Sequence, residues 1–84
     1  MNTKKKILLV DDNDFILLML EKYISEWPEY ETVSAKNGVE ALEVIEKESF
    51  DLIVTDILMP KKDGIELIQE LREMGIDTPV IVIS

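Results

Sequence analysis

Three short apolar runs in this chain of 84 residues each end in a side chain that carries oxygen. Runs of this length and composition are typical of strands buried in a parallel sheet. The carboxyl ends of parallel strands meet at one edge of the sheet, where ligands bind, so we expect these side chains to converge on one site. The runs are residues 7–10 before Asp11 and Asp12, residues 52–55 before Asp56, and residues 80–83 before Ser84.

The apolar runs alternate with segments of helical periodicity, a pattern typical of β–α–β units. We predict an α/β fold with four strands and about three helices, the first of them capped by Asn13 or Asp14. The strands are predicted at about residues 6–11, 31–35, 51–55 and 79–84, and the helices at about 13–26, 38–48 and 63–75. The residues expected to face the core from the second and third helices are Val39, Leu42, Val44, Ile45, Ile65, Leu67, Ile68 and Leu71.

The order of the strands follows from which of them are apolar on both faces. The first and third have this character, which predicts central positions with helices on both sides of the sheet. Right-handed crossovers with one reversal of winding then give the order 2-1-3-4 in a doubly wound sheet. The reversal lies between the first and third strands, so Asp11, Asp12 and Asp56 are expected at the topological switch point, with Ser84 on the next strand.

Composition limits the classes of partner. A content of 46% hydrophobic and 32% charged residues predicts one small globular domain. The net charge of −9 and the pI of about 4.3 argue against nucleic acid and anionic membranes, which both attract basic surfaces. The chain has neither cysteine nor histidine, so disulfides and thiolate metal sites are excluded and any phosphohistidine must belong to another molecule.

Three neighbouring carboxylates repel one another unless a cation neutralises them. Oxygen ligands without imidazole or thiolate favour Mg²⁺, with Mn²⁺ or Ca²⁺ as substitutes. A carboxylate can also act as a nucleophile and form an acyl phosphate, and a metal ion then offsets the charge that develops. The strand ends therefore predict a metal and phosphoryl site built from Asp11, Asp12 and Asp56.

Taken together, these markers resemble the receiver domain of two-component response regulators, a flavodoxin-like fold. The residues that carry the resemblance are Asp11-Asp12, Asp56, Met59-Pro60, Asp63-Gly64 and Ser84. The resemblance implies that Asp56 is the phosphoacceptor and that Asp12, Asp56 and the backbone carbonyl of Leu58 bind Mg²⁺ directly, with Asp11 acting through water. It further implies that Ser84 is the switch hydroxyl, that the phosphodonor is a histidine kinase or a small acyl phosphate, and that the protein is cytoplasmic.

The chain also departs from the family pattern. Receiver domains continue with a fourth helix, a fifth strand that ends in a phosphate-binding lysine, and a fifth helix. We therefore expect residues 1–84 to form a single incomplete receiver-like domain, truncated after the fourth strand. Lys61 and Lys62 do not match the position of that lysine, so no catalytic lysine is assigned. We expect a phosphoacceptor impaired by truncation, with at most weak autophosphorylation and autodephosphorylation, rather than an enzyme.

Two other functions remain as alternatives. Residues 80–84 form an uncharged edge strand, and residues 15–20 of the first helix are apolar nearly all round, a profile that predicts a self-associating or interacting half-domain, engineered or natural. A phosphatase that uses an aspartyl phosphate is disfavoured because Leu58 stands where such enzymes carry a second carboxylate. Each marker taken alone is also compatible with a helix cap or a turn.

Overall fold

The computed structural model describes residues 4–59 and 61–83, which form an α/β domain with one parallel sheet. The strands lie in the order β2-β1-β3-β4 and all three pairings are parallel, so the predicted order is confirmed. Pro60 and Ser84 lie outside the described residues. The elements are β1 (Lys5–Val10), α1 (Asp14–Ile24), β2 (Tyr30–Ala35), α2 (Gly38–Lys47), β3 (Leu52–Asp56), α3 (Gly64–Glu73) and β4 (Val80–Ile83).

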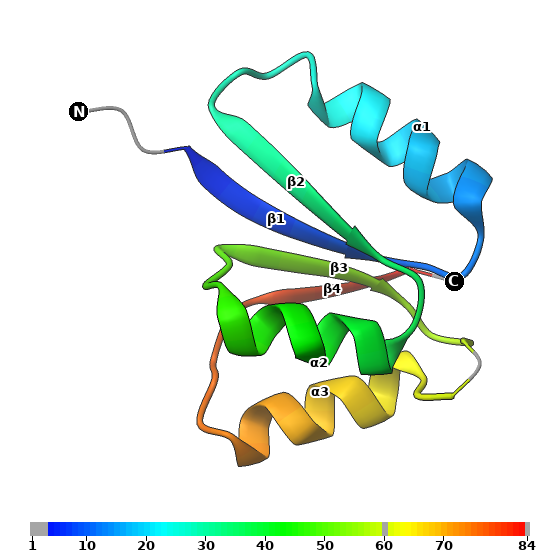
Figure 1. Cartoon of the computed structure of the whole chain (residues 1–84), viewed down its shortest axis with the longest axis vertical. Coiled ribbons are helices and arrows are strands. Elements are labelled where there is room, and N and C mark those ends of the chain that lie inside the picture. The colour runs from blue at the N-terminus through cyan, green and yellow to red at the C-terminus, as the bar shows by residue number, and fades with distance from the viewer. Residues whose placement is uncertain (1–3, 60, 84) are drawn as a thin grey trace.

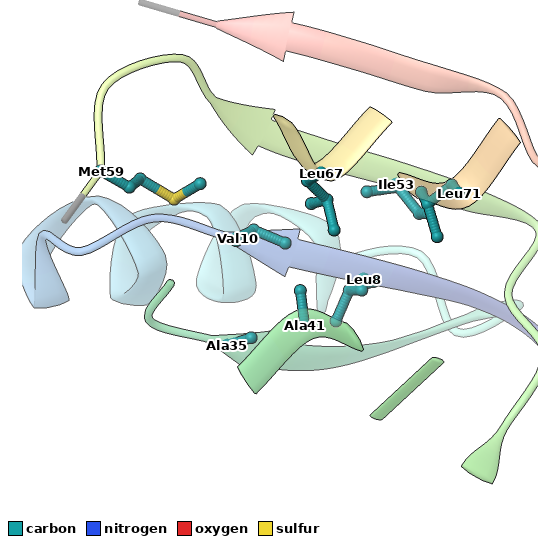
Figure 2. Close-up of a cluster of buried hydrophobic side chains, with 8 residues drawn as sticks. All are labelled: Leu8, Val10, Ala35, Ala41, Ile53, Met59, Leu67 and Leu71. Carbon is teal, nitrogen blue, oxygen red and sulfur yellow. The ribbon is translucent and has the colours of Figure 1, made fainter. Parts of the chain in front are cut away.

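The sheet is covered on both faces, by α1 on one side and by α2 and α3 on the other (Figure 1). The core is divided in the same way, because successive side chains of a strand point to opposite faces. Ile7 and Leu9 of β1 pack with Leu17 of α1. Leu8 and Val10 belong to the second cluster, together with residues of α2 and α3 (Figure 2). This burial of both faces of β1 is what its uninterrupted apolar run predicts.

Polar caps begin all three described helices. Asn13, Asn37 and Asp63 each accept a hydrogen bond from a backbone N–H two or three residues further on. Asp63 also forms a capping box, in which the Glu66 side chain accepts from the Asp63 N–H. Each helix has 10 or 11 residues, and in the described part of the chain none is long and apolar enough to cross a membrane.

Two residues predicted to face the core are exposed instead. Val39 is 41% exposed and Ile65 is 49% exposed, although each lies in the first turn of its helix. The buried residue in each case is the glycine one position earlier, Gly38 in α2 and Gly64 in α3. One residue corresponds to about 100° of helix rotation, so burial of the glycine turns the following side chain away from the core.

Candidate functional site

The strand ends bring together the three predicted aspartates. Val10 pairs with Thr55, so Asp11 and Asp56 follow adjacent positions of neighbouring strands. Asp11, Asp12 and Asp56 each offer a carboxylate oxygen, and these three atoms lie within 4.8 Å of one another. The convergence expected from the sequence is therefore present for the three acids.

Asp11 is the most buried of the three, with 4% of its surface exposed. One of its carboxylate oxygens accepts a hydrogen bond from the Asn13 N–H at 2.9 Å. Burial raises the pKa of Asp11, and the charges of Asp56 and Asp12 raise it further, while the Asn13 N–H opposes the shift. A positive charge placed beside these acids would relieve both the repulsion and the cost of burial.

A pocket of about 220 Å³ opens beside the acids. Of the described residues that line it, none is basic, so no protein cation there neutralises the carboxylates. Three close carboxylate oxygens in an open, acidic pocket suit a hard divalent cation that retains some of its water. The lining residues are Asp11, Asp12, Asn13, Ile16, Asp56 and Ile83.

The loop after β3 approaches the same edge of the sheet. The Gly64 N–H donates to the Ile57 carbonyl at 2.9 Å, which closes the loop at its base. A Cβ on residue 64 would lie less than 3.0 Å from the Asp56 carbonyl oxygen, so only glycine fits there without a shift of the backbone. Met59 is buried in the core, whereas the Leu58 side chain is 78% exposed. The loop thus holds the backbone that follows Asp56 in a defined path.

Two of the lysines near the site form ion pairs outside the pocket. The Lys62 ammonium pairs with Glu70 of α3, and this hydrogen bond raises the pKa of Lys62. Lys61 is exposed. Lys36, which follows β2, pairs with Asp14 at 3.2 Å. None of these three lysines is among the described residues that line the acidic pocket.

Sequence reasoning named the acids but missed part of the pocket wall. Asn13 was predicted only as a helix cap, yet it also lines the pocket beside Ile16 of α1. Its position immediately after Asp11 and Asp12 was the available signal. Ile83 also lines the pocket and pairs with Asp56 in the sheet, whereas the predicted switch hydroxyl, Ser84, lies outside the described residues.

The fold and the site together define a doubly wound α/β domain with an acidic pocket at its topological switch point. Among known families, the model of the response regulator receiver domain matches residues 7–84. The chain therefore belongs to the receiver-domain family, whose members are signalling domains of two-component systems. The resemblance seen in the sequence is confirmed.

Curated relatives and solved structures agree with this assignment. The alkaline phosphatase synthesis transcriptional regulatory protein PhoP of Bacillus subtilis is 41% identical over 80 residues, covering 95% of this chain and 33% of that protein. The chemotaxis protein CheY of Halobacterium salinarum is 39% identical, covering 93% of this chain and 64% of the relative. The receiver domain of the Francisella response regulator 1452 has a TM-score of 0.89 at 38% identity, covering 94% of this chain and 64% of that one.

The extent of these matches differs between the relatives. The chain spans about a third of the length of PhoP and of other curated regulators that it matches. It spans about two thirds of the Francisella receiver structure. The chemotaxis protein CheY4 from Vibrio cholerae has a TM-score of 0.87 at 32% identity, and the match covers 95% of this chain and 68% of CheY4. The similarity therefore extends over only part of each of these proteins.

Proposed function

We propose that the chain is a phosphoaccepting module of a two-component phosphorelay, with Asp56 as the acceptor and Mg²⁺ as the cofactor. The observation that carries the proposal is the group of three carboxylate oxygens within 4.8 Å of one another, at the edge of a pocket without a basic lining residue. Asp12, Asp56 and the Leu58 carbonyl are the proposed direct ligands, and Asp11 acts through water. Mn²⁺ and Ca²⁺ are possible substitutes, since both accept oxygen ligands.

In the proposed reaction, a carboxylate oxygen of Asp56 attacks the phosphorus of a histidine kinase phosphohistidine or of an acyl phosphate. A phosphorus–oxygen bond forms, and the bond between phosphorus and the donor breaks, so that imidazole or carboxylate leaves with the electron pair. The bound cation supplies charge stabilisation for the transferred group. Asp11 and Asp12 hold that charge beside Asp56, and the backbone around Ile57 fixes the direction of the attacking carboxylate.

Ser84 is proposed as the switch hydroxyl that donates a hydrogen bond to the phosphoryl oxygen. The family resemblance supports this role, as does the pairing of Asp56 with Ile83, the residue before Ser84. None of the described lysines lines the pocket. Under this proposal the domain transmits a signal and turns over no substrate, beyond weak modification and loss of its own phosphoryl group.

The test is incubation with acetyl phosphate and Mg²⁺, followed by intact-mass analysis. Wild type should gain one phosphoryl group, which chelation of the metal prevents, and Asp56→Asn should gain none. Asp77→Asn is the matched control. It removes the charge of an exposed aspartate between α3 and β4, which lies near the amino-terminal end of β4, whereas the three acids follow the carboxyl ends of β1 and β3. Equal modification of wild type and Asp56→Asn, or a complete lack of modification of wild type, would refute the proposal.

Self-association is a second candidate function, supported by exposed apolar side chains on β4 and α1. Ile81 is 49% exposed and Val82 is 37% exposed, on opposite faces of the edge strand. On α1 and the turn after it, the exposed residues are Phe15, Leu18, Met19, Tyr23 and Trp27. Such surfaces favour pairing with a second copy.

Light scattering at micromolar concentration tests this candidate. We expect an oligomer that Val82→Lys dissociates, since the substitution places a charge on the pairing edge. Thr32→Lys on β2, the opposite edge strand, is the control and should leave the size unchanged. A monodisperse wild-type monomer with a cooperative thermal transition would contradict the candidate.

A further inference from the structure

The loop that follows Asp56 rests on the first residue of α2. The Gly38 N–H donates to the Lys62 carbonyl at 3.1 Å. A Cβ on residue 38 would lie 2.6 Å from that carbonyl oxygen and 2.7 Å from the Lys62 Cβ, closer than any real Cβ approaches such atoms. Helix α2 therefore meets the loop backbone at a distance that only glycine allows. Asn37, which caps α2, is itself 7% exposed, so this end of the helix is firmly embedded.

The rest of the loop is fixed by three further contacts. Gly64 closes the base of the loop on Ile57, Met59 is buried in the core, and the Lys62 side chain pairs with Glu70. Between these points Lys61 has a φ of 70°, a left-handed conformation that is unfavourable for a side chain with a Cβ. Tertiary contacts, rather than the preference of the loop sequence, therefore impose this shape.

We propose that Gly38 is a positioning residue for the divalent cation, acting through the loop of residues 57–63. The inference rests on the proposed function, in which the Leu58 carbonyl is a metal ligand. The Leu58 side chain is 78% exposed, so its own packing contributes little to the direction of that carbonyl. The anchors on either side of Leu58 determine it instead, and α2 contributes the Gly38–Lys62 contact to them.

This arrangement couples the start of α2 to the metal. Residues that orient a metal ligand without touching the ion commonly change the affinity by 10- to 100-fold when they are replaced. The coupling is reciprocal by thermodynamic necessity: if the Gly38 contact strengthens metal binding, metal binding strengthens the Gly38 contact by the same factor. Two independent measurements follow, one on a variant and one on wild type.

The first measurement is titration with MgCl₂, followed by calorimetry and by the amide NMR signals of residues 57–59 and 61–63. For Gly38→Ala we expect a dissociation constant about 10-fold higher than that of wild type, with these signals displaced before metal is added. Gly75→Ala is the matched control, because Gly75 has a φ of 80° and nothing lies within 4 Å of a Cβ there. It perturbs a helix end of the same fold and should bind Mg²⁺ as wild type does.

The outcomes separate this inference from the proposed function. A folded Gly38→Ala protein that binds Mg²⁺ as tightly as wild type would overturn the inference alone. Failure of wild type to bind Mg²⁺ would overturn the proposed function and the inference with it. If Gly38→Ala does not fold, hydrogen exchange of wild type decides: saturating MgCl₂ should slow exchange of the Gly38 amide more than that of Ala41, which donates to Asn37 within the same helix end. Equal slowing of the two amides would refute the coupling.

Discussion

Gly64→Ala tests the packing that holds the backbone of the candidate acceptor. The added methyl would lie less than 3.0 Å from the Asp56 carbonyl oxygen, whereas ordinary contacts begin at 3.4 Å. It would also lie 3.3 Å from the Asp56 carbonyl carbon and from the Ile57 Cα. All of these are backbone atoms, so no side-chain rotation relieves the clash. Either α3 or the end of β3 has to move by more than about 0.4 Å, which is the difference between these distances.

The expected cost follows from two opposing effects. Overpacking of this kind costs about 1–3 kcal/mol, while alanine is favoured over glycine in a helix by about 1 kcal/mol. We therefore expect Gly64→Ala to lower the free energy of unfolding by up to about 2 kcal/mol in urea titrations followed by circular dichroism. The amide NMR signals of Asp56 and Ile57 should shift, because the displaced backbone is their own.

Gly75→Ala provides the control for this experiment too. Its left-handed backbone makes a Cβ unfavourable by about 1 kcal/mol, yet the new methyl touches nothing. It should thus cost a similar free energy without moving the signals of Asp56 and Ile57. A Gly64→Ala protein as stable as wild type, with unchanged signals at Asp56 and Ile57, would refute the reasoning.

Three further predictions concern the stability of the fold. Leu8→Ala, at a fully buried core position, should cost about 2–5 kcal/mol in urea titrations, whereas Leu18→Ala, at a position 64% exposed, should cost under about 0.5 kcal/mol. Asp63→Ala removes the capping box of α3 and should cost about 1 kcal/mol by the same method; a cost near zero would show that the cap contributes nothing. The hydrogen bond to Glu48 raises the pKa of Lys6 above 10.5, so the pair stabilises the fold below that pH and its contribution is lost as pH rises through the folded pKa. Destabilisation by Glu48→Gln should accordingly be constant near neutral pH and vanish at strongly alkaline pH, and a loss that persists there would contradict this account.

The sequence predicted the strand order because the order depends on a pattern that is local to each strand. β1 is apolar at every position from Ile7 to Val10, and only a strand covered on both faces buries all four residues. Once β1 and β3 are central, the carboxyl ends carrying Asp11 and Asp56 must be neighbours. The three aspartates of the candidate metal site could therefore be predicted, since their positions follow from the topology of the sheet alone.

The wall of the pocket was harder to predict, because it depends on contacts between elements. Ile16 faces the acids from the first turn of α1, and that orientation follows from how α1 packs on β1 and β2. The ion pair between Lys62 and Glu70 could not be predicted either, because it depends on which face of α3 packs against the loop. Periodicity identifies which face of a helix is apolar but does not fix its rotation to within one residue.

One common cause explains why Val39 and Ile65 are exposed and why the loop after β3 has a fixed conformation. Gly38 and Gly64 are the first residues of α2 and α3, and both pack against backbone between Asp56 and Lys62. A helix that buries a bare glycine at this point must turn its next, apolar residue outward, so some hydrophobic burial is lost at each helix start. Full burial of such a side chain is worth about 1.5–3 kcal/mol, and Val39 and Ile65, at 41% and 49% exposed, forgo roughly half of that. A fold that tolerates this loss twice, at the two helix starts that meet one loop, gains close backbone support for that loop, which is what the proposed metal ligand, the Leu58 carbonyl, would require.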